Sequence, residues 1–454
     1  MKQEVQWTSL MDAPLIRTEI PGKKSTELLA IQDKLETSSR SYTTFFRLAI
    51  DRGIGSTLVD VDGNVFIDWF GGVAVMNLGH GNPIVINAIK EQLDKITHLT
   101  EIPTEARINY LKRLNEVLPA GMRDRSRVMF TVTGGDACEA AVSLARHVTG
   151  KRTIIAFAGS YHGIAGGIVN ATSNTHYREY AGFYNSNFFH VPYPYQYRFP
   201  WPVDKEDISK SVVGYIENIM RDHYSGVPPV AGILVEPIQG EGGYVVPPDD
   251  FLPMLRETAD KFSIPLIIDE VQSGIGRTGR IWASEHYNVT PDIMCISKSI
   301  GGGIPISSIA YRSDYDNIPP AFHLGTYRGN PLGLAAGASI LEYLKDSNIL
   351  DRVRTKGEYL KRRMIEVQEG SRIIGEVRGK GYMIGMEIVK RGSKEPDGKA
   401  ASAIRESMLK SGVLMHTCGH YSNVMRFMAP LTIEDQLLNK GLEILSESVK
   451  KTEG

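Results

Sequence analysis

The chain has 454 residues, of which 42% are hydrophobic and 23% are charged, as is usual for a soluble globular protein. Lysine and arginine number 51 against 52 aspartates and glutamates, and the resulting net charge of -1 argues against binding to nucleic acid or to an anionic membrane. No apolar run reaches the roughly 18 residues of a membrane span, and the first twenty residues lack the pattern of a signal peptide. We therefore expect a cytoplasmic protein with two lobes around a large core.

The three cysteines, Cys138, Cys295 and Cys418, are far apart and show no Cys-x-x-Cys spacing. This spacing argues against a disulfide framework and against a zinc site. We expect no metal, and we expect all three to be small buried residues, because free cysteine is among the most buried residue types.

The N-terminal part and the middle of the chain differ in their hydrophobic pattern. Residues 1–55 are polar and predict a helix and an arm, and residues 58–68 predict two short strands joined at Asp62-Gly63, a dipeptide typical of hairpin turns. From residue 80 to residue 345, apolar runs alternate with amphipathic stretches, which indicates an α/β domain with a mostly parallel sheet covered on both faces. Strands are expected near 128–132, 154–157, 232–235, 266–268 and 293–296, and helices over 137–146 and 251–262.

Residues 346–454 predict a smaller α+β domain. Its helices are expected near 351–368 and 399–411, and its strands near 382–388 and 424–428. The segment 186–204 is rich in aromatic residues and proline, and it predicts an ordered loop without regular secondary structure. The expected organisation is a large domain over 80–345 and a small domain over 346–454 to which residues 1–79 contribute.

The first chemical signal is Lys298, which directly follows the strand expected near 293–296 and precedes the three glycines 301–303. The carboxyl ends of the strands are where α/β folds bind ligands. An amine held there can lose its proton and form a Schiff base. Taken alone, the pattern is better explained by a surface lysine at a turn.

A second signal is Asp269, which ends the strand expected near 266–268 and so belongs to the same edge of the sheet as Lys298. A carboxylate there can hold the proton on the nitrogen of a pyridine cofactor, and Gln272 can donate to a phenolic oxygen on that ring. The alternative is that Asp269 caps the backbone that follows it.

The third signal is the turn after the strand expected near 128–132, where Thr133, Gly134 and Gly135 open a helix. Unpaired amides at a helix start bind anions, and glycine lets a phosphate approach the backbone. A simple N-cap by Thr133 explains the same residues equally well.

A fourth signal is Tyr161-His162, after the strand expected near 154–157, where an aromatic ring can stack on a flat cofactor. As a lone motif it is weak, because most aromatic residues belong to the core. The order of the four signals along the chain favours an enzyme that uses pyridoxal phosphate (PLP).

With these residues in view, the chain resembles the class III (ω-type) aminotransferases of PLP fold type I, from about Leu58 to Thr432. The resemblance implies an α/β large domain like that of aspartate aminotransferase and a smaller α+β domain. It also implies transfer of an amino group from a small amino acid or ω-amino compound to a 2-oxo acid such as 2-oxoglutarate. The matching stretches are 133–137, 161–163, 236–243, 269–279, 297–298, 325–327 and Arg426.

The resemblance assigns roles around the ring of the cofactor. Lys298 resembles the Schiff-base lysine that also shuttles the substrate proton, and Asp269 resembles the partner of the pyridinium nitrogen. Gln272 resembles the donor to the ring oxygen. Tyr161 takes the stacking position, next to His162 in the cofactor-binding motif, and Glu236 takes a supporting position near the ring.

The resemblance also assigns the phosphate contacts. Gly134 and Gly135 look like the residues whose amides hold the phosphate. Thr326 resembles a threonine whose hydroxyl reaches the phosphate bound by the neighbouring subunit. A homodimer, or a dimer of dimers, is therefore implied.

Four positions bear on the substrate. Glu241 and Arg426 match a pair in which the arginine grips the α-carboxylate of the oxo acid and the glutamate neutralises it when that group is absent. Ile164 replaces the arginine of 4-aminobutyrate aminotransferases, and Val73 replaces a tyrosine of the ornithine-type enzymes; both predict a more apolar pocket. Arg328 replaces a usually small residue, and we interpret it as one half of a surface ion pair rather than as an anion contact.

The stretch 190–194 and the insert after it resemble the branch of the family that includes amino-acid racemases and epimerases. Racemisation of an apolar amino acid needs an acid or base opposite the lysine, and Glu241 could supply it. Because that branch favours the shorter aspartate in this loop, we favour transamination and keep racemisation as the alternative.

Two interpretations from other classes are weaker. Residues 274–279 fit the G-x-G-x-x-G fingerprint of dinucleotide-binding folds, but Asp292 precedes the next strand instead of ending it. A non-catalytic relative of the family is disfavoured because Lys298, Asp269 and Gln272 are all present.

Overall fold

The structure is a computed structural model that describes residues 8–179 and 187–454. It divides the chain into two compact units, a smaller one made of residues up to Ile86 together with Val353–Gly454, and a larger one made of Asn87–Arg352. Residues 1–7, which belong to the expected N-terminal arm and to the start without a signal-peptide pattern, lie outside the described residues. Residue 186, the first of the expected loop 186–204, lies outside them as well. In the part of the chain that is described, no helix has both the length and the apolar character needed to cross a membrane.

The larger unit contains a seven-stranded sheet with the order β4-β10-β9-β8-β7-β5-β6. β10 is antiparallel to β4 and β9, and the other neighbours are parallel, so the prediction of a mostly parallel sheet is confirmed. The strands are β4 (Ser126–Thr131), β5 (Thr153–Phe157), β6 (Phe188–Val191), β7 (Val230–Val235), β8 (Leu266–Asp269), β9 (Ile293–Ile296) and β10 (Ser307–Arg312).

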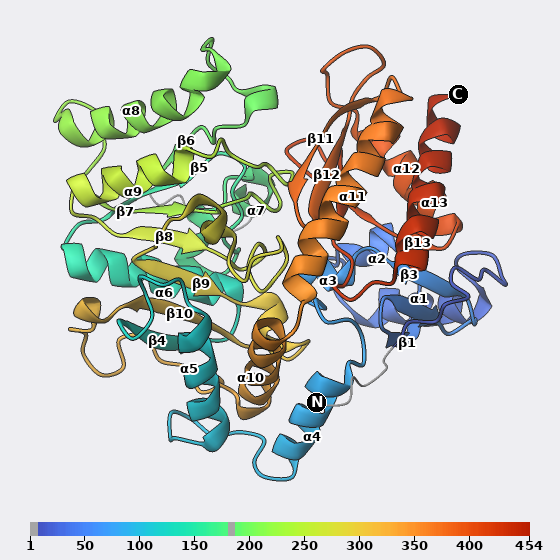
Figure 1. Cartoon of the computed structure of the whole chain (residues 1–454), viewed down its shortest axis with the longest axis horizontal. Helices are drawn as coiled ribbons and strands as arrows, with labels where there is room; N and C mark the ends of the chain where they lie inside the picture. Colours follow the sequence, from blue (N-terminus) through green and yellow to red (C-terminus); the bar gives the residue numbers. More distant parts are fainter. Residues whose placement is uncertain (1–7, 180–186) are drawn as a thin grey trace. The chain divides into compact units, whose positions relative to one another are not determined.

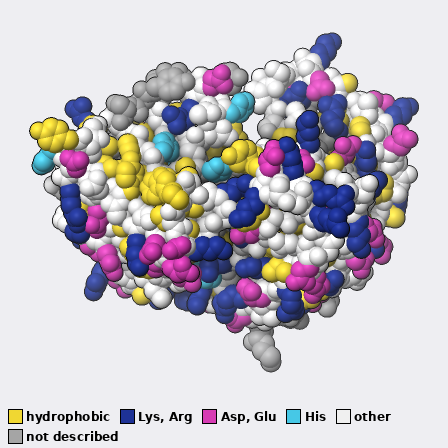
Figure 2. Space-filling model, turned by 90° about the horizontal axis from the view of Figure 1, so that it is seen from above, with side chains coloured by type: hydrophobic (Ala, Val, Ile, Leu, Met, Phe, Trp, Pro, Cys, Tyr) yellow, Lys and Arg dark blue, Asp and Glu magenta, His cyan; other side chains and the backbone are white. Residues whose placement is uncertain are grey.

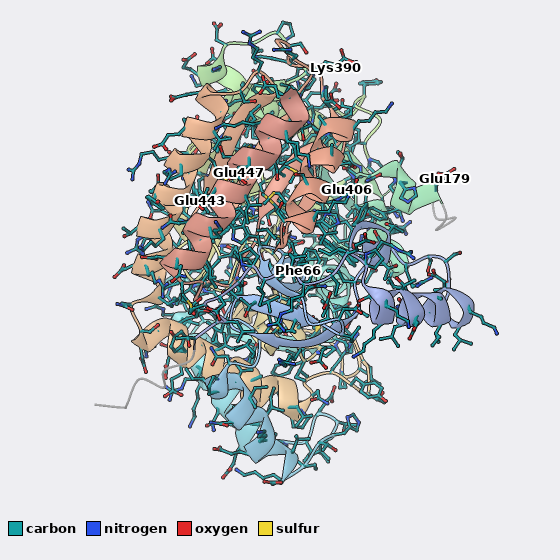
Figure 3. All side chains as sticks on the ribbon, turned by 90° about the vertical axis from the view of Figure 1, so that its right-hand side faces the viewer. Phe66, Glu179, Lys390, Glu406, Glu443 and Glu447 are labelled. Atoms are coloured by element: carbon teal, nitrogen blue, oxygen red, sulfur yellow. The ribbon has the colours of Figure 1, made fainter. Side chains whose placement is uncertain are left out.

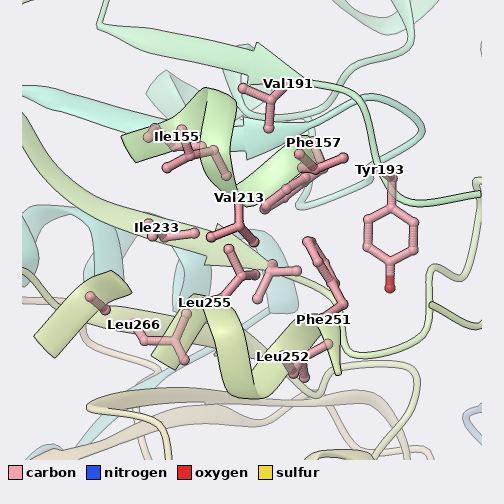
Figure 4. Close-up of a cluster of buried hydrophobic side chains, with 14 of the residues drawn as sticks. Ile155, Phe157, Val191, Tyr193, Val213, Ile233, Phe251, Leu252, Leu255 and Leu266 are labelled. Atoms are coloured by element: carbon pink, nitrogen blue, oxygen red, sulfur yellow. The ribbon is translucent and has the colours of Figure 1, made fainter. Parts of the chain in front are cut away.

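Helices cover both faces of this sheet because alternate side chains of each central strand enter different hydrophobic clusters. In β5, Ile155 and Phe157 pack with α8 (Ile208–Arg221) and α9 (Phe251–Lys261), and this cluster is drawn in Figure 4. Ile154 and Ala156 belong to the other cluster, together with α6 (Gly134–Thr149). Strands buried on both faces read as continuous apolar runs, which is why the sequence indicated them without alternation.

One edge of the sheet collects the predicted chemical residues. β4, β5, β7, β8 and β9 run in the same direction, since β4 and β9 are both antiparallel to β10 and the rest pair in parallel. Their carboxyl ends therefore lie along one edge, and the turns that follow them contain the predicted residues Gly134, Tyr161, Glu236, Gln272 and Lys298. Figure 1 shows this arrangement of strands, with α8 and α9 on one side.

Other helices complete the larger unit and connect it with the rest of the chain. They are α5 (Glu105–Val117), α7 (Thr175–Glu179) and α10 (Pro331–Asp346). Two further helices, α4 (Pro83–Leu93) and α11 (Ile349–Glu369), carry the chain across the division between the units.

The smaller unit contains two four-stranded sheets, β1-β2-β3-β13 and β11-β12-β15-β14. The predicted hairpin is confirmed, with β2 (Thr57–Asp60) antiparallel to β3 (Val65–Asp68). β13 comes from the C-terminal part of the chain and pairs in parallel with β3, so both ends of the sequence build one sheet. The remaining elements are β1 (Ile50–Ile54), β11 (Ile374–Lys380), β12 (Met383–Ile388), β13 (Val413–Leu414), β14 (His416–Cys418), β15 (Val424–Phe427), α1 (Lys23–Leu35), α2 (Tyr42–Phe45), α3 (Gly71–Ala74), α12 (Gly398–Lys410) and α13 (Asp435–Glu453).

The polar and apolar faces of α13 are separated. Glu443 and Glu447 project from the exposed face of α13, whereas Leu442 and Leu445 on the same helix are buried (Figure 3). Phe66, on β3, is completely buried. On the face of the molecule drawn in Figure 2, basic and acidic side chains are interspersed, in keeping with the net charge of -1.

The prediction that residues 186–204 lack regular secondary structure is wrong in part. Phe188–Val191 forms β6, which pairs in parallel with β5 from Ile154↔Phe188 to Phe157↔Val191. The strand ends before Pro192, whose missing N–H cannot continue the ladder. Pairing with β5, rather than local sequence, therefore gives this segment its strand.

Candidate active site

A cavity of about 280 Å³ lies at the carboxyl edge of the sheet in the larger unit. It brings together ten of the predicted site residues: Gly134, Gly135, Tyr161, His162, Ile164, Glu236, Glu241, Asp269, Gln272 and Lys298. A larger hollow of about 470 Å³ between α11 and α13 is lined by ion-paired Lys356 and Asp435 and contains none of the predicted site residues. The smaller cavity is therefore the candidate active site.

Lys298 enters the cavity from a strained backbone. It is separated from the end of β9 by Ser297 alone and opens a short 3-10 turn, Lys298–Gly301. Its φ of 52° lies in the left-handed region, which costs a residue other than glycine on the order of 1 kcal/mol. Such strain persists where the surrounding structure dictates the conformation, and here it directs the chain so that the lysine side chain lines the cavity.

Asp269 ends β8 and is buried beneath the cavity with three hydrogen-bond donors around its carboxylate. Oδ2 accepts from Nδ1 of His162 at 2.8 Å and from the thiol of Cys138 at 3.2 Å, and Oδ1 accepts from the N–H of Val271 at 2.9 Å. Burial alone would raise the pKa of Asp269, but the hydrogen bond and charge of His162, with the other two donors, outweigh it and lower the pKa. Asp269 is thus an ionised carboxylate at neutral pH.

His162 is held rigidly beside Asp269. Its backbone N–H donates to Oγ1 of Thr172 at 2.9 Å, and its ring is buried. Because Nδ1 faces the Asp269 carboxylate, Nε2 is the nitrogen left over, and it is buried without a hydrogen-bond partner among the described residues. A buried polar atom of this kind indicates a missing binding group.

Cys138, His162 and Asp269 offer ligand atoms within 4.8 Å of one another, close enough to share a metal ion. The thiol and the imidazole, however, both hydrogen-bond the same oxygen of Asp269. The neighbouring Cys295 thiol and burial raise the pKa of Cys138 well above its usual value, whereas a metal needs the thiolate. We interpret the cluster as the hydrogen-bonding environment of Asp269. All three cysteines of the chain are free and buried, as predicted.

Glu236 joins two of the turns at the edge of the sheet. Its Oε1 accepts from the N–H of Tyr161 at 3.0 Å, and its Oε2 accepts from the N–H of Gly240 at 2.8 Å. Burial raises the pKa of Glu236 to about 7, and the nearby charge of Asp269 adds to the rise. The carboxyl group therefore ties the loop after β7 to the turn after β5.

The N-terminal end of α6 forms one wall of the cavity. Thr133 caps this helix by accepting from the N–H of Asp136 at 3.3 Å, so the N-cap alternative is realised as well. A Cβ on Gly134 would lie 2.8 Å from Cγ1 of Val271, and one on Gly135 would lie 3.3 Å from the Cα of Gly163. Both positions thus have room for little more than a hydrogen, and they leave the backbone at the helix start accessible to an anion.

Three further predicted residues line the cavity. Oε1 of Gln272 is buried without a hydrogen-bond partner among the described residues, and the lack of a side chain at Gly240 leaves room for this amide. Glu241 is half-buried in the tight loop closed by the Gln239↔Val245 bridge. Ile164 lies at the rim with 50% of its surface exposed.

The sequence pattern of the class III aminotransferase family matches residues 37–449. The chain belongs to this family. The structure agrees with this assignment. The larger unit has a mostly parallel sheet, and Lys298, Asp269, Gly134 and Gly135 lie at one edge of it.

Two curated relatives and one solved structure represent the similarity of this class III aminotransferase to known proteins. Diaminobutyrate–2-oxoglutarate aminotransferase of Haemophilus influenzae is 35% identical over 92% of this chain and 94% of its own length. Alanine/serine racemase of Pyrococcus horikoshii is 34% identical over 98% of this chain and 94% of its own. The structure of taurine:2-oxoglutarate aminotransferase from Bifidobacterium kashiwanohense, in complex with PLP and glutamate, has a TM-score of 0.87 at 26% identity and covers 94% of this chain and 98% of its own.

The cofactor of this class III aminotransferase is PLP. The residues of the cavity fit that group in several independent ways. Nε2 of His162 and Oε1 of Gln272 are buried polar atoms that lack a protein partner in the described structure, and Gln272 can present an N–H instead if its amide is turned over. The ionised Asp269 suits a protonated ring nitrogen, and the start of α6 suits a phosphate.

Three predicted residues of this class III aminotransferase lie outside the lining of the cavity. Thr326 is exposed, in the loop that precedes α10. Val73 belongs to the smaller unit, in the turn Gly71–Ala74, where its φ of 63° is left-handed. Arg426 also belongs to the smaller unit and is almost completely buried on β15.

Two further residues differ from their expected roles in this class III aminotransferase. Cys138 was expected only to be a small buried residue, yet its thiol donates to Asp269. The available signal was its position four residues after Gly134, one helical turn into α6. Arg328 forms an ion pair with Asp136 as expected, but it is not a surface pair, since the Arg328 side chain is only 11% exposed.

Proposed function

We propose that this enzyme transfers an amino group from a small amino acid or an ω-amino compound to a 2-oxo acid such as 2-oxoglutarate. The observation that carries the proposal is the position of Lys298 and Asp269. Asp269 ends β8 and Lys298 comes just after the neighbouring parallel strand β9, and both line the cavity that also contains the start of α6. The similarity to the diaminobutyrate–2-oxoglutarate and taurine:2-oxoglutarate aminotransferases supports 2-oxoglutarate as the acceptor.

The proposed roles around the ring are those that the family resemblance implies, and the geometry of the cavity supports them. PLP, when bound, supplies an aldehyde that links covalently to amines and a ring that withdraws electrons from them. Lys298 would hold the cofactor between turnovers, and its freed ε-amine would remove the proton from the substrate Cα and return it at a different carbon, on the cofactor side, as transfer of the amino group requires. Asp269 keeps a proton on the ring nitrogen, and His162 fixes the orientation of Asp269.

The remaining groups bind and orient. The amides of Gly134 and Gly135 hold the phosphate, and Tyr161 stacks against the ring. Gln272 donates to the ring oxygen. Glu236 keeps the turn that carries Tyr161 in place through its two backbone hydrogen bonds.

In the larger unit, Ile164 and Glu241 are the proposed substrate residues; the family resemblance implies the same task for Val73 and Arg426, which belong to the smaller unit. Ile164 offers an apolar surface at the rim of the cavity. The resemblance places an arginine at this position in 4-aminobutyrate aminotransferases, where it holds the distal carboxylate of the substrate. The family resemblance implies that Arg426 grips the α-carboxylate of the oxo acid, and that Glu241 neutralises the arginine when the amino donor lacks that carboxylate.

We also propose that the enzyme is a homodimer, able to pair into a dimer of dimers, and that it works in the cytoplasm. Thr326 is exposed, and the residues on either side of Gly325-Thr326 are apolar and unusually open, with Leu324 at 64% and Tyr327 at 67% exposed. A second subunit would cover these side chains. The hydroxyl of Thr326 would then donate to the phosphate of the cofactor that the second subunit binds. The neighbouring free thiols of Cys138 and Cys295 support a reducing compartment.

The decisive variant is Lys298→Ala. It should lose turnover, and borohydride reduction should no longer attach a pyridoxyl group to the protein, although PLP still binds without a covalent bond. Lys210→Ala, an exposed lysine paired with Asp207 at 3.1 Å, is the matched control and should behave like the unmodified enzyme. Full activity of Lys298→Ala, or labelling at another lysine in active enzyme, would refute the proposal.

A second candidate function is racemisation of an apolar amino acid. The observation in its favour is the alanine/serine racemase, whose similarity extends over 98% of this chain, together with Glu241 in the lining of the cavity as an acid or base. Purified enzyme is incubated with single amino acids, with and without 2-oxoglutarate. Glutamate formed only with the acceptor indicates transamination, and loss of optical rotation without it indicates racemisation.

A further inference from the structure

Asp136 places a carboxylate at the N-terminal end of α6, the end that we propose binds the cofactor phosphate. It is the third residue of the helix, its N–H donates to Oγ1 of Thr133, and its Oδ2 accepts from the N–H of Val132 at 2.9 Å. A carboxylate in this position is favourable for the helix dipole. It also has the same sign of charge as a phosphate, so the two anions repel each other at one helix end.

Arg328 supplies the charge that balances Asp136. Its Nη2 donates to Oδ1 of Asp136 at 3.0 Å, and its Nη1 is buried without a hydrogen-bond partner among the described residues. His323 Nε2 lies 3.8 Å from the same oxygen, but burial, followed by the charge of Arg328, lowers the pKa of His323. His323 is therefore neutral at pH 7, and Arg328 is the cation that neutralises this carboxylate.

The loop that carries Arg328 is fixed from the side of α5. Nη2 of Arg107 donates to the backbone carbonyl oxygens of Arg328 at 3.4 Å and Gly329 at 3.3 Å. Asn330, next in the chain, donates to the carbonyl oxygen of Thr97 at 3.2 Å and caps α10 with its Oδ1. The guanidinium is thus held in position before any ligand binds, which removes the entropic cost of ordering a long side chain.

We propose that Arg328 is a positioning residue for the cofactor phosphate and acts through Asp136. By cancelling the charge of Asp136 in a partly buried ion pair, it makes the start of α6 suited to a dianionic group. The inference rests on the proposed function, since it needs a phosphate at Gly134 and Gly135. Arg328 stands where the family resemblance predicts a small residue. The neutralisation of Asp136 by an arginine is therefore a feature of this chain's own sequence.

The test compares two ligands that differ only in the phosphate. Apoenzymes of wild type, Arg328→Gln, Asp136→Asn and the double variant are titrated with PLP and with pyridoxal, and each Kd is measured from cofactor absorbance and tryptophan quenching. Arg328→Gln should raise the Kd of PLP about tenfold while changing that of pyridoxal less than about twofold, because only PLP meets the unmasked charge. Asp136→Asn should not weaken PLP binding, and the double variant should match Asp136→Asn.

Two control variants make the comparison sharper. Arg328→Lys keeps the charge and should keep most of the affinity for PLP. Arg221→Gln removes an ion pair with Glu217 at 2.6 Å on α8, which packs on the opposite face of the sheet from α6, and should change neither Kd.

Each other outcome has a definite meaning. Equal weakening of PLP and pyridoxal in Arg328→Gln would overturn the proposal in favour of a packing role. Asp136→Asn as weak as Arg328→Gln would mean that the pair only clamps the loop, and a double variant that stays weak would mean that Arg328 contacts the phosphate directly. If wild-type apoenzyme binds no PLP at all, the proposed function fails instead.

Discussion

Replacing Glu236 with glutamine should change how the stability of the apoenzyme depends on pH. Burial raises the pKa of Glu236 to about 7, whereas the same carboxyl in the unfolded chain has a pKa of 4.5. The folded protein thus holds this proton over a range in which the unfolded chain has released it. The contribution of Glu236 to stability is most favourable below pH 4.5, declines as the pH rises to 7, and is constant above that.

The size of the effect follows from the shift in pKa. Two and a half pH units correspond to about 3 kcal/mol at 25 °C. If Asn87–Arg352 unfolds as one body with about 2.1 cal/mol/K of entropy per residue, this free energy is worth about 5 °C in Tm. Glutamine cannot ionise, but its amide can accept only one of the hydrogen bonds that Tyr161 and Gly240 now donate, a constant cost of about 1–3 kcal/mol.

Wild type should therefore be more stable than Glu236→Gln at pH 5, and the difference in Tm should shrink by about 5 °C or change sign by pH 8. The assay is a series of thermal scans of both apoenzymes from pH 5 to pH 8 at constant ionic strength. Glu257→Gln, an exposed glutamate on α9, is the control and should follow wild type at every pH. Parallel profiles for wild type and Glu236→Gln would refute the reasoning.

Two other substitutions test the edge of the sheet. Asp269→Asn should lower kcat by at least about 100-fold, because the ring nitrogen loses its ionised partner; steady-state kinetics with a saturating donor check this, and a normal kcat would exclude the role. Gly163→Ala should lower stability by about 2 kcal/mol and reduce PLP content, because the new Cβ would lie 2.5 Å from the Cα of Gly135. Gly214→Ala on α8, where a Cβ meets nothing within 4 Å, should leave the protein unchanged or slightly more stable, and equal Tm values for the two alanine variants would contradict the steric argument.

The sequence predicted those strands whose residues are nearly all apolar and buried. β5, β7, β8 and β9 are short runs of apolar residues buried on both faces, and such runs are legible in the sequence. β10 begins Ser-Ser and was not anticipated, because its strand conformation depends on β4 and β9, which pair with it on either side. Long-range pairing of this kind overrides local propensity.

In the candidate site too, some positions could be predicted from the sequence, whereas contacts that depend on packing could not. Lys298 and Asp269 could be placed at one edge because the ends of parallel strands define that edge. The hydrogen bond from Cys138 to Asp269 could not be foreseen, since it depends on how α6 is rotated against β8. The ion pair between Arg328 and Asp136 joins residues 192 positions apart and depends on how the loop before α10 packs.

Ile164 has half of its surface in solvent although it borders the cavity. A side chain in that position contributes little to the free energy of unfolding, so it can be exchanged without loss of the folded state. Lys298 and Asp269, by contrast, are fixed by backbone strain and by buried hydrogen bonds. Under the proposed roles, natural variation and laboratory engineering can thus change Ile164 to accept new amino donors while Lys298 and Asp269 keep their positions.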